Sequence, residues 1–339
     1  MMRRPVRLSD VALAAGTSTK TASRVINGDP RVADETRKRV EDQVDLLGYR
    51  VDVMARSLRR GVDDTVGIVV PTIGDPFFAT MIEEIERIAL VREMTVLIAS
   101  NSRNPMTERR VVDGMLARRV GGMIIAPFAT DYGFLATLQT PVIFLDRHAQ
   151  GSDVGVVLVD DFGEAQKAVR HLAHYGHSRI ALVVDDLDIE TSRRRHQGYV
   201  AALTELGLPV DESIQLVGCT DAVTAEVRTR ELIALPNPPT AIFSARSETS
   251  LGVVRALHLC KRTDIAFVSF GDFVNADILD PAITVLDHNP RILARLAMER
   301  LLDQMANEEA QSLGDAVIGL NLIARGSGEL PPKTLAATG

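Results

Sequence analysis

The 339-residue sequence predicts a mixed α/β protein in which a small all-helical head precedes two doubly wound α/β subdomains. Three observations support this prediction. Two short helical patterns around a glycine begin the chain, apolar runs alternate with helical patterns from Thr65 onward, and charge is unevenly divided. Residues 1–60 have a net charge of +5, whereas the remainder has −12. A basic module joined to an acidic body is typical of a protein in which only the module contacts nucleic acid.

The first two helices form a predicted helix-turn-helix. Ser9 is a suitable N-cap for the first helix, Gly16 permits a sharp turn, and Ser18 can cap a second helix over residues 19–27. Small and branched apolar residues of the second helix would face inward, leaving polar and cationic groups outside, as base reading in the major groove requires. An ordinary helical hairpin with a solvated face is the alternative. The residues predicted to contact DNA here are Ser18, Thr19, Lys20, Thr21, Ser23, Arg24 and Asn27.

A third helix is expected over residues 34–47, ending at Gly48. Beyond it, residues 52–60 contain a lone leucine, Leu58, among three arginines. An apolar wedge flanked by phosphate-binding cations suits the minor groove of DNA. A short charged linker helix is the alternative interpretation.

The pattern from Thr65 onward predicts the α/β body. Continuous apolar runs separated by helical stretches indicate parallel sheets with helices on both faces. Two such halves would face each other across a cleft at the carboxyl ends of their strands. Strands are expected over residues 66–70, 95–98, 123–126, 142–145, 180–184, 214–217, 241–243 and 265–268. Helices of the first half are expected over residues 77–92, 106–118 and 132–138.

Enzyme and metal chemistry have little support in the sequence. It contains no GxSxG, HExxH or P-loop motif. His171, His174 and His177 are three apart, but no acidic or cysteine partner is near in sequence, so a structural or surface role is expected. Asp160 and Asp161 are a weak signal for paired catalytic carboxylates. We therefore predict no catalytic residue, metal or cofactor.

The two cysteines, Cys219 and Cys260, are too few for a disulfide framework. No apolar run approaches the ~20 residues of a membrane span, and the first ten residues contain no apolar signal region. We expect a cytoplasmic protein with no membrane partner.

Residues 8–27 resemble the N-terminal signature of the lactose-repressor (LacI–GalR) family, which is close to LxDVAxxAGVSxxTVSRVLN. Thr17 and Ala22 stand where that family prefers valine. Residues 52–60 resemble the family's hinge helix, and this implies that Ala55 and Leu58 enter the minor groove of DNA.

The body resembles the effector-binding core of the same family, which shares its fold with periplasmic sugar-binding proteins. The similar segments are residues 70–78, 144–147, 176–181, 238–243 and 325–329, so the resemblance covers residues 8–331. It implies a DNA-binding domain at 1–49, a hinge at 50–64 and a core at 65–339, with chain crossings between subdomains near Asp160, His288 and Ile323. The implied subdomains are about 65–160 with 289–322, and about 161–288 with 323–339.

The resemblance also implies an effector site in the cleft. The residues at matching positions are Phe77, Phe78, Asp146, Arg147, Arg195, Arg246, Asp272 and His288. Arg246 replaces a common Asn or Asp, and Gly271 replaces a common Asp, so a more positive cleft and an anionic effector such as a sugar acid or sugar phosphate are expected. The alternative is an ordinary sugar pocket in which Asp146, Asp272 or Glu248 neutralises Arg246.

Together these features predict a homodimeric transcriptional repressor that binds a palindromic operator in double-stranded DNA and responds to a small sugar-like effector. A tetramer is left open. A solute-binding protein with the same core but no regulatory role is the alternative, and the basic head argues against it.

Overall fold

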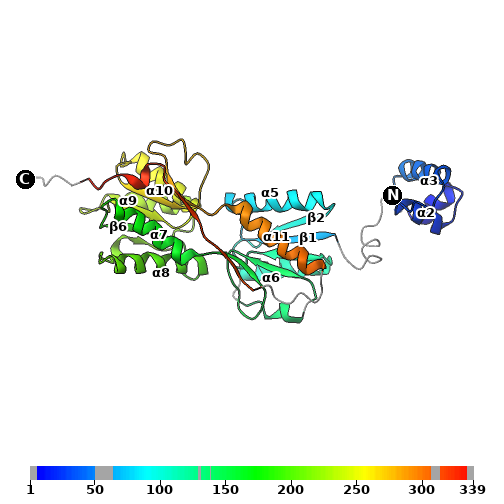
Figure 1. The fold of residues 1–339 in the computed structure, drawn as a ribbon, viewed down its shortest axis with the longest axis horizontal. Coiled ribbons are helices and arrows are strands. Elements are labelled where there is room, and N and C mark those ends of the chain that lie inside the picture. Colours follow the sequence, from blue (N-terminus) through cyan, green and yellow to red (C-terminus); the bar gives the residue numbers. More distant parts are fainter. Residues whose placement is uncertain (1–5, 50–63, 129–130, 138, 307–313, 334–339) are drawn as a thin grey trace, which may run out of the picture. The chain divides into compact units, whose positions relative to one another are not determined.

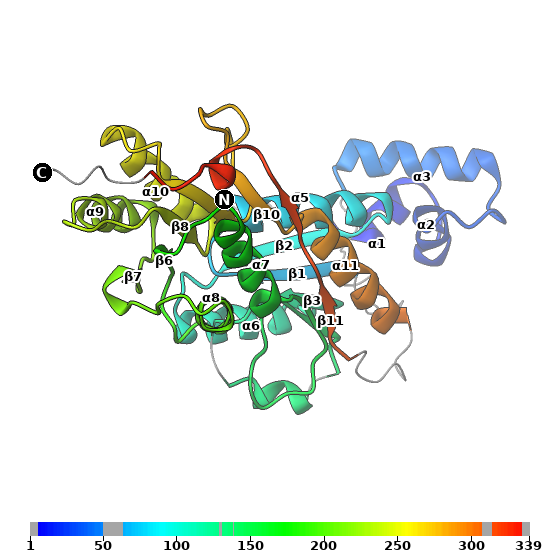
Figure 2. The same cartoon turned by 60° about the vertical axis from the view of Figure 1, so that its left-hand side comes forward.

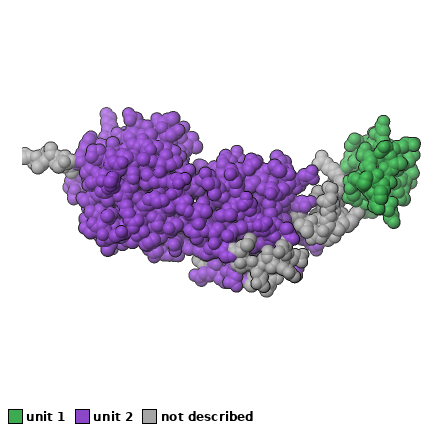
Figure 3. Space-filling model, in the orientation of Figure 1, with its two compact units in different colours: residues 1–63 green, residues 64–339 purple. Residues whose placement is uncertain are grey.

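The computed structural model describes residues 6–49, 64–128, 131–137, 139–306 and 314–333. The chain divides between Asp63 and Asp64 into two compact units, a head and a body, shown in different colours in Figure 3. The expected hinge, with Ala55 and Leu58, lies outside the described residues. Among the helices that are described, none has the length and apolar character needed to span a membrane.

Three described helices form the head: α1 (Leu8–Ala14), α2 (Thr19–Ile26) and α3 (Asp34–Leu47). They enclose a small apolar core of Val11, Ala12, Ala15, Ala22, Val25 and Val40. A core of this size is built almost wholly from contacts between neighbouring helices, which explains why local sequence patterns predict it well.

The helix ends of the head follow from capping chemistry, with one correction. Ser9 does not cap α1, because the helix begins at Leu8, two residues earlier than expected, with Arg7 as its N-cap; the carboxylate of Asp10 accepts a hydrogen bond from the Arg7 amide at 2.9 Å. Ser18 caps α2 as expected, its Oγ accepting from the Thr21 amide at 3.1 Å. At the end of α3, Gly48 has φ 63°, a left-handed conformation that glycine adopts without steric cost.

The body contains two six-stranded sheets (Figure 1). The first has the order β11-β5-β4-β3-β1-β2 and the second β12-β10-β9-β8-β6-β7. All of their strand pairs are parallel except β10 with β12. The first sheet consists of β1 (Thr65–Val70), β2 (Thr95–Ser100), β3 (Gly122–Ile125), β4 (Val142–Leu145), β5 (Val156–Val159) and β11 (Ala316–Ile318). The second consists of β6 (Ile180–Val183), β7 (Gln215–Leu216), β8 (Ala241–Ser244), β9 (Ala266–Phe270), β10 (Thr284–Asp287) and β12 (Asn321–Ile323).

Helices cover both faces of each sheet (Figures 1 and 2). In the first subdomain, Ile68 of β1 packs in the cluster of α5 and α11, whereas its neighbour Val69 packs in that of α6. In the second, Leu182 packs with α7 and α8, and Val183 with α9 and α10. Strands β1 and β6, in the interior of their sheets, are therefore apolar on both sides, as buried parallel sheets require. The helices are α5 (Pro76–Val91), α6 (Pro105–Ala117), α7 (Asp161–His174), α8 (Glu190–Glu205), α9 (Ala222–Ile233), α10 (Ser247–Leu259) and α11 (Pro290–Ala306).

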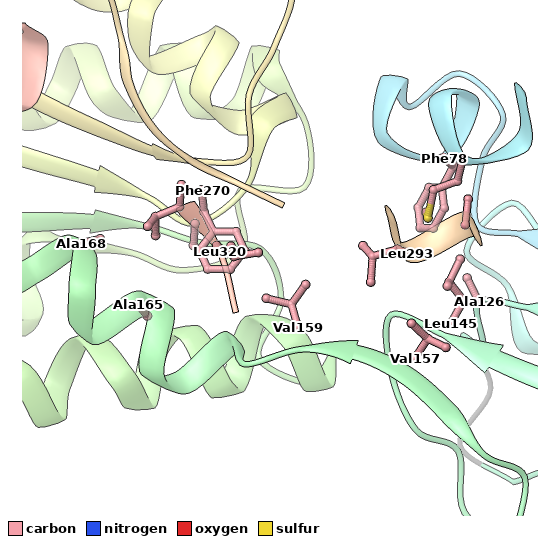
Figure 4. Close-up of a cluster of buried hydrophobic side chains, with 14 of the residues drawn as sticks. Phe78, Ala126, Leu145, Val157, Val159, Ala165, Ala168, Phe270, Leu293 and Leu320 are labelled. Atoms are coloured by element: carbon pink, nitrogen blue, oxygen red, sulfur yellow. The ribbon is translucent and has the colours of Figure 1, made fainter. Parts of the chain in front are cut away.

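The chain crosses between the subdomains at three places in the described body. It passes from β5 to α7 at Asp160, from β10 to α11 at residues 288–289, and from β11 to β12 at residues 319–320. The third crossing comes earlier than the expected Ile323, because β12 already pairs with β10 of the second sheet. Around the crossings, Val159 and Leu320 join one apolar cluster that extends into both subdomains (Figure 4). The crossings are thus packed connections rather than free linkers.

Candidate functional site

The outer face of α2 presents polar and cationic side chains to solvent. Thr19, Lys20, Arg24 and Asn27 are exposed, and Ser23 is half-buried beneath the Asn27 amide, which donates to the Ser23 carbonyl at 2.8 Å. An open groove runs over this face, lined by Leu8, Thr19, Lys20, Ser23, Arg24, Asn27, Asp29 and Arg31. The structure thus brings five of the predicted DNA-contacting residues together on one surface.

Ser18 and Thr21 differ from the others, because their hydroxyl groups bond to each other at 2.9 Å as part of the helix cap. Nearby, the Asp29 carboxylate accepts two hydrogen bonds from the Arg31 guanidinium, and these hold the pKa of Asp29 well below its usual range. Arg24 is only 3.9 Å from the same carboxylate. This pairing orients the loop after α2 beside the exposed face.

A cleft separates the two subdomains at the carboxyl ends of their strands, with a cavity of about 60 Å³ at its centre. Seven of the eight predicted effector residues line it. Asp272 is the exception, because it turns to Arg325 with contacts of 2.9 and 2.5 Å and is not part of the lining. The full lining is Pro71, Thr72, Asp75, Phe77, Phe78, Arg103, Phe128, Asp146, Arg147, Asp185, Ile189, Thr191, Ser192, Arg195, Arg246, Ser247 and His288.

Arg195 of α8 is held firmly at the base of the cleft. Its Nε donates to Asp161 at 2.7 Å and its Nη1 to the Ala245 carbonyl at 2.7 Å, while its guanidinium lies 3.8 Å above the Phe270 ring. Burial raises the pKa of Asp161 to about 6, although the charge of Arg195 acts in the opposite direction. These contacts fix the orientation of the guanidinium, and two of its nitrogen atoms already donate hydrogen bonds within the protein.

His288 lies opposite, against the Phe77 ring at 4.5 Å between centroids. Burial, reinforced by the charge of Arg195, lowers the pKa of His288 to about 3, so the imidazole is neutral at physiological pH. Its Nδ1 is buried and has no hydrogen-bond partner among the described residues. Gly271 makes room for this ring: its φ is 96°, and a Cβ there would lie 2.7 Å from His288 Nε2. A side chain at position 271 would therefore crowd the His288 ring, and glycine avoids this contact.

The charge of Arg246 is fully compensated, which corrects the expectation of a positive cleft. Its guanidinium lies 2.9 Å from Asp75 and 2.9 Å from Asp185, and it also contacts Glu248. Of the three carboxylates that the sequence suggested as partners, only Glu248 serves. Arg147 is likewise paired with Asp146 at 2.7 Å.

Sequence patterns missed several residues of the cleft, notably Asp75, Arg103, Phe128 and Asp185. Asp75 is the N-cap of α5, the helix that carries the two phenylalanines, and Asp185 lies two residues after the end of β6. Helix caps and strand ends were therefore the available signals. Arg103 had no such signal. Of the three histidines spaced three apart, for which a structural or surface role was expected, His171 bonds to Glu329 at 2.5 Å and His177 to Thr240 at 2.9 Å.

Comparison with known proteins identifies the family. Residues 7–52 match the family model described as "Bacterial regulatory proteins, lacI family", and residues 63–320 match "Periplasmic binding proteins and sugar binding domain of LacI family". The chain belongs to the LacI family. It is a helix-turn-helix transcriptional regulator, and this family is one of regulators rather than enzymes.

Among its LacI-family relatives, the transcriptional repressor CytR of Escherichia coli K12 is 30% identical over 330 residues, covering 94% of this chain and 95% of CytR. Catabolite control protein A of Priestia megaterium is 30% identical, covering 90% and 93% of the two chains. The structure of the Lac repressor bound to ONPG matches with a TM-score of 0.83 and 25% identity over 96% of this chain and all of the other. A CelR–cellobiose complex matches with a TM-score of 0.70, 25% identity and the same coverage.

Proposed function

We propose that this LacI-family regulator is a repressor that binds a palindromic operator in double-stranded DNA through α2. The observation that supports this most directly is the exposed face of Thr19, Lys20, Arg24 and Asn27 over an open groove. These side chains can donate to guanine or accept from adenine edges, and the cations can contact phosphates. CytR, its relative, is named as a transcriptional repressor. Such a protein would act in the cytoplasm, where bacterial DNA is found.

A homodimer would match the two-fold symmetry of a palindrome. Apolar side chains that a monomer leaves in water support this part of the proposal. In the first subdomain they lie at the end of α5 and on the edge strand β2, and in the second on α9, α10 and the segment after β9. They are Leu90, Val91, Ile98, Val223, Val227, Leu251, Val274 and Ile278. Burying them against a second copy would remove their apolar surface from water.

The cleft is proposed as the site of a small, neutral, polyhydroxylated effector. Each cleft arginine has a carboxylate partner in the closed cleft, so an anion would meet no unpaired positive charge there. The hydroxyl groups of a sugar, by contrast, can donate to the Nδ1 of His288, and the sugar ring can pack against Phe77. The complex of CelR with cellobiose is consistent with this choice. Sugar acids and sugar phosphates are therefore the less favoured ligands.

Operator binding can be tested by selecting binding sites from random DNA with the full chain and then measuring affinities by fluorescence anisotropy. Replacing Lys20 or Arg24 by alanine should weaken binding by about 1–3 kcal/mol if the side chain reads a base, and relax specificity at that position. Lys38→Ala on exposed α3 is the matched control. Failure to select any DNA site would favour a solute-binding protein without a regulatory role.

The effector can be sought by thermal shift, because a ligand of the folded state raises the unfolding temperature. Matched pairs of an aldose and its acid or phosphate should be compared in the same screen. Stronger stabilisation by the charged member would contradict the proposal of a neutral ligand.

A further inference from the structure

Two arginines bridge the cleft from opposite sides. Arg103, in the first subdomain, places Nη2 3.0 and 2.8 Å from the two carboxylate oxygens of Asp185 in the second. Arg246, in the second subdomain, places Nη2 2.9 Å from Asp75 in the first and Nη1 2.9 Å from Asp185. The four side chains therefore form one continuous chain of ion pairs across the cleft.

The carboxylates in these contacts are shielded from water, and the two arginines are partly buried. The side chains of Asp75 and Asp185 are each only 4% exposed, and that of Arg246 is 19% exposed. The carbonyl of Thr220 accepts from both arginines, at 3.4 and 3.3 Å. Charge-assisted bonds of this kind are stronger than exposed surface pairs, because less water competes for the charges. They hold the two subdomains together only while the cleft is closed.

The backbone that presents Arg103 is also unusual. Ser102 and Arg103 both have φ 55°, in the left-handed region that residues with side chains rarely adopt. The turn is held by the Arg103 amide, which donates to Asn101 Oδ1 at 2.8 Å, and by Asn104, which caps α6. Such backbone conformations persist where the surrounding structure imposes them, often at functional sites. Here the conformation sets the position from which Arg103 reaches across the cleft.

We propose that Arg103, Arg246, Asp75 and Asp185 form a clasp that closes the cleft when no effector is bound. This proposal rests on the proposed function, because it takes the cleft to be the effector site. With the clasp in place the cavity is about 60 Å³, whereas ligand pockets usually measure about 300–1,000 Å³. An effector must therefore displace at least one clasp arginine to enter. Binding is thereby coupled to a change in the contact between subdomains.

Single-molecule FRET on the full chain, without effector or DNA, tests the clasp. Gln197 on α8 and Glu299 on α11 are exposed, one in each subdomain, and can be replaced by cysteine for labelling. Cys219→Ala and Cys260→Ser remove the native thiols. Labelled chains are mixed with excess unlabelled chains so that a dimer carries one dye pair. The effector-free protein should show one population, with any open state at or below about 10%.

Arg103→Gln with Arg246→Gln should create a second population of different transfer efficiency that contains at least about half of the molecules. Arg109→Gln is the matched control, since Arg109 pairs with Asp113 on the exposed surface of α6 and does not cross the cleft. Circular dichroism melting checks that each variant is folded, and Asp185→Asn provides an independent way to break the clasp. A single unchanged population in both folded clasp variants would overturn the proposal. That result would leave the proposed operator and effector binding intact, because neither ligand is present.

Discussion

Replacing Arg195 by alanine should destabilise the protein mainly through the carboxylate that it leaves behind. The side chains of Arg195 and Asp161 are 9% and 4% exposed and lie 2.7 Å apart. Removing one member of a buried ion pair typically costs about 3–5 kcal/mol, because the other charge stays buried without a partner. Arg195→Ala with Asp161→Asn should recover a large part of this loss, because the double variant buries no carboxylate.

The loss should also depend on pH. The pKa of Asp161 is raised in the folded protein from 3.8 to about 6, so this residue's contribution to stability is complete below pH 4 and is lost as the pH rises through 6. A rise of two units corresponds to about 3 kcal/mol. Without Arg195 the folded pKa rises further, so the difference in stability between wild type and variant should be larger at pH 8 than at pH 5.

Urea unfolding followed by circular dichroism at pH 5 and pH 8 measures both effects. Arg170→Ala is the control, because its 2.6 Å pair with Glu205 is exposed and should contribute less than about 1 kcal/mol. If Arg195→Ala cost the same at both pH values, or no more than the control, the assignment of Arg195 as the counter-ion of Asp161 would be wrong.

Three further predictions concern other parts of the molecule. Gly271→Ala should lower the unfolding free energy, measured by urea unfolding, by about 1–3 kcal/mol, because residue 271 has a positive φ and a Cβ there would contact His288. Gly207→Ala is the control that separates backbone strain from crowding, because Gly207 also has a positive φ but has open space around it. Val227→Asp should shift the protein toward monomer in analytical ultracentrifugation if α9 belongs to the dimer interface, and an unchanged sedimentation coefficient would exclude that face. Leu58→Ala, outside the described residues, should reduce operator bending measured by FRET while effector affinity stays the same; equal bending would remove the wedge role.

The sequence by itself predicted the parts of the fold that depend on short-range chemistry. Helix α3 begins at Asp34 and ends at Leu47 as expected, because its periodicity and the glycine after it are local features. Ser18 caps α2 for the same reason. The strands β1 to β4 and β6 to β9 were also predicted, because their apolar runs can be recognised without knowing which strands they pair with. Four strands were not predicted: β5, β10, β11 and β12, all of which lie next to the chain crossings between the subdomains. For β11 and β12, pairing with strands that are distant in the sequence, rather than their own composition, makes them part of a sheet.

Only the tertiary structure decided the electrostatics of the cleft. Arg246 is 171 residues from Asp75 and 61 from Asp185 in the sequence, so no local pattern could show that these three side chains meet. The sequence alone therefore suggested a cleft with an excess of positive charge, whereas folding brings a carboxylate to each cleft arginine. The difference arises because the net charge of the cleft depends on which strand and helix ends meet there. Buried charges are stable only where such partners are within reach.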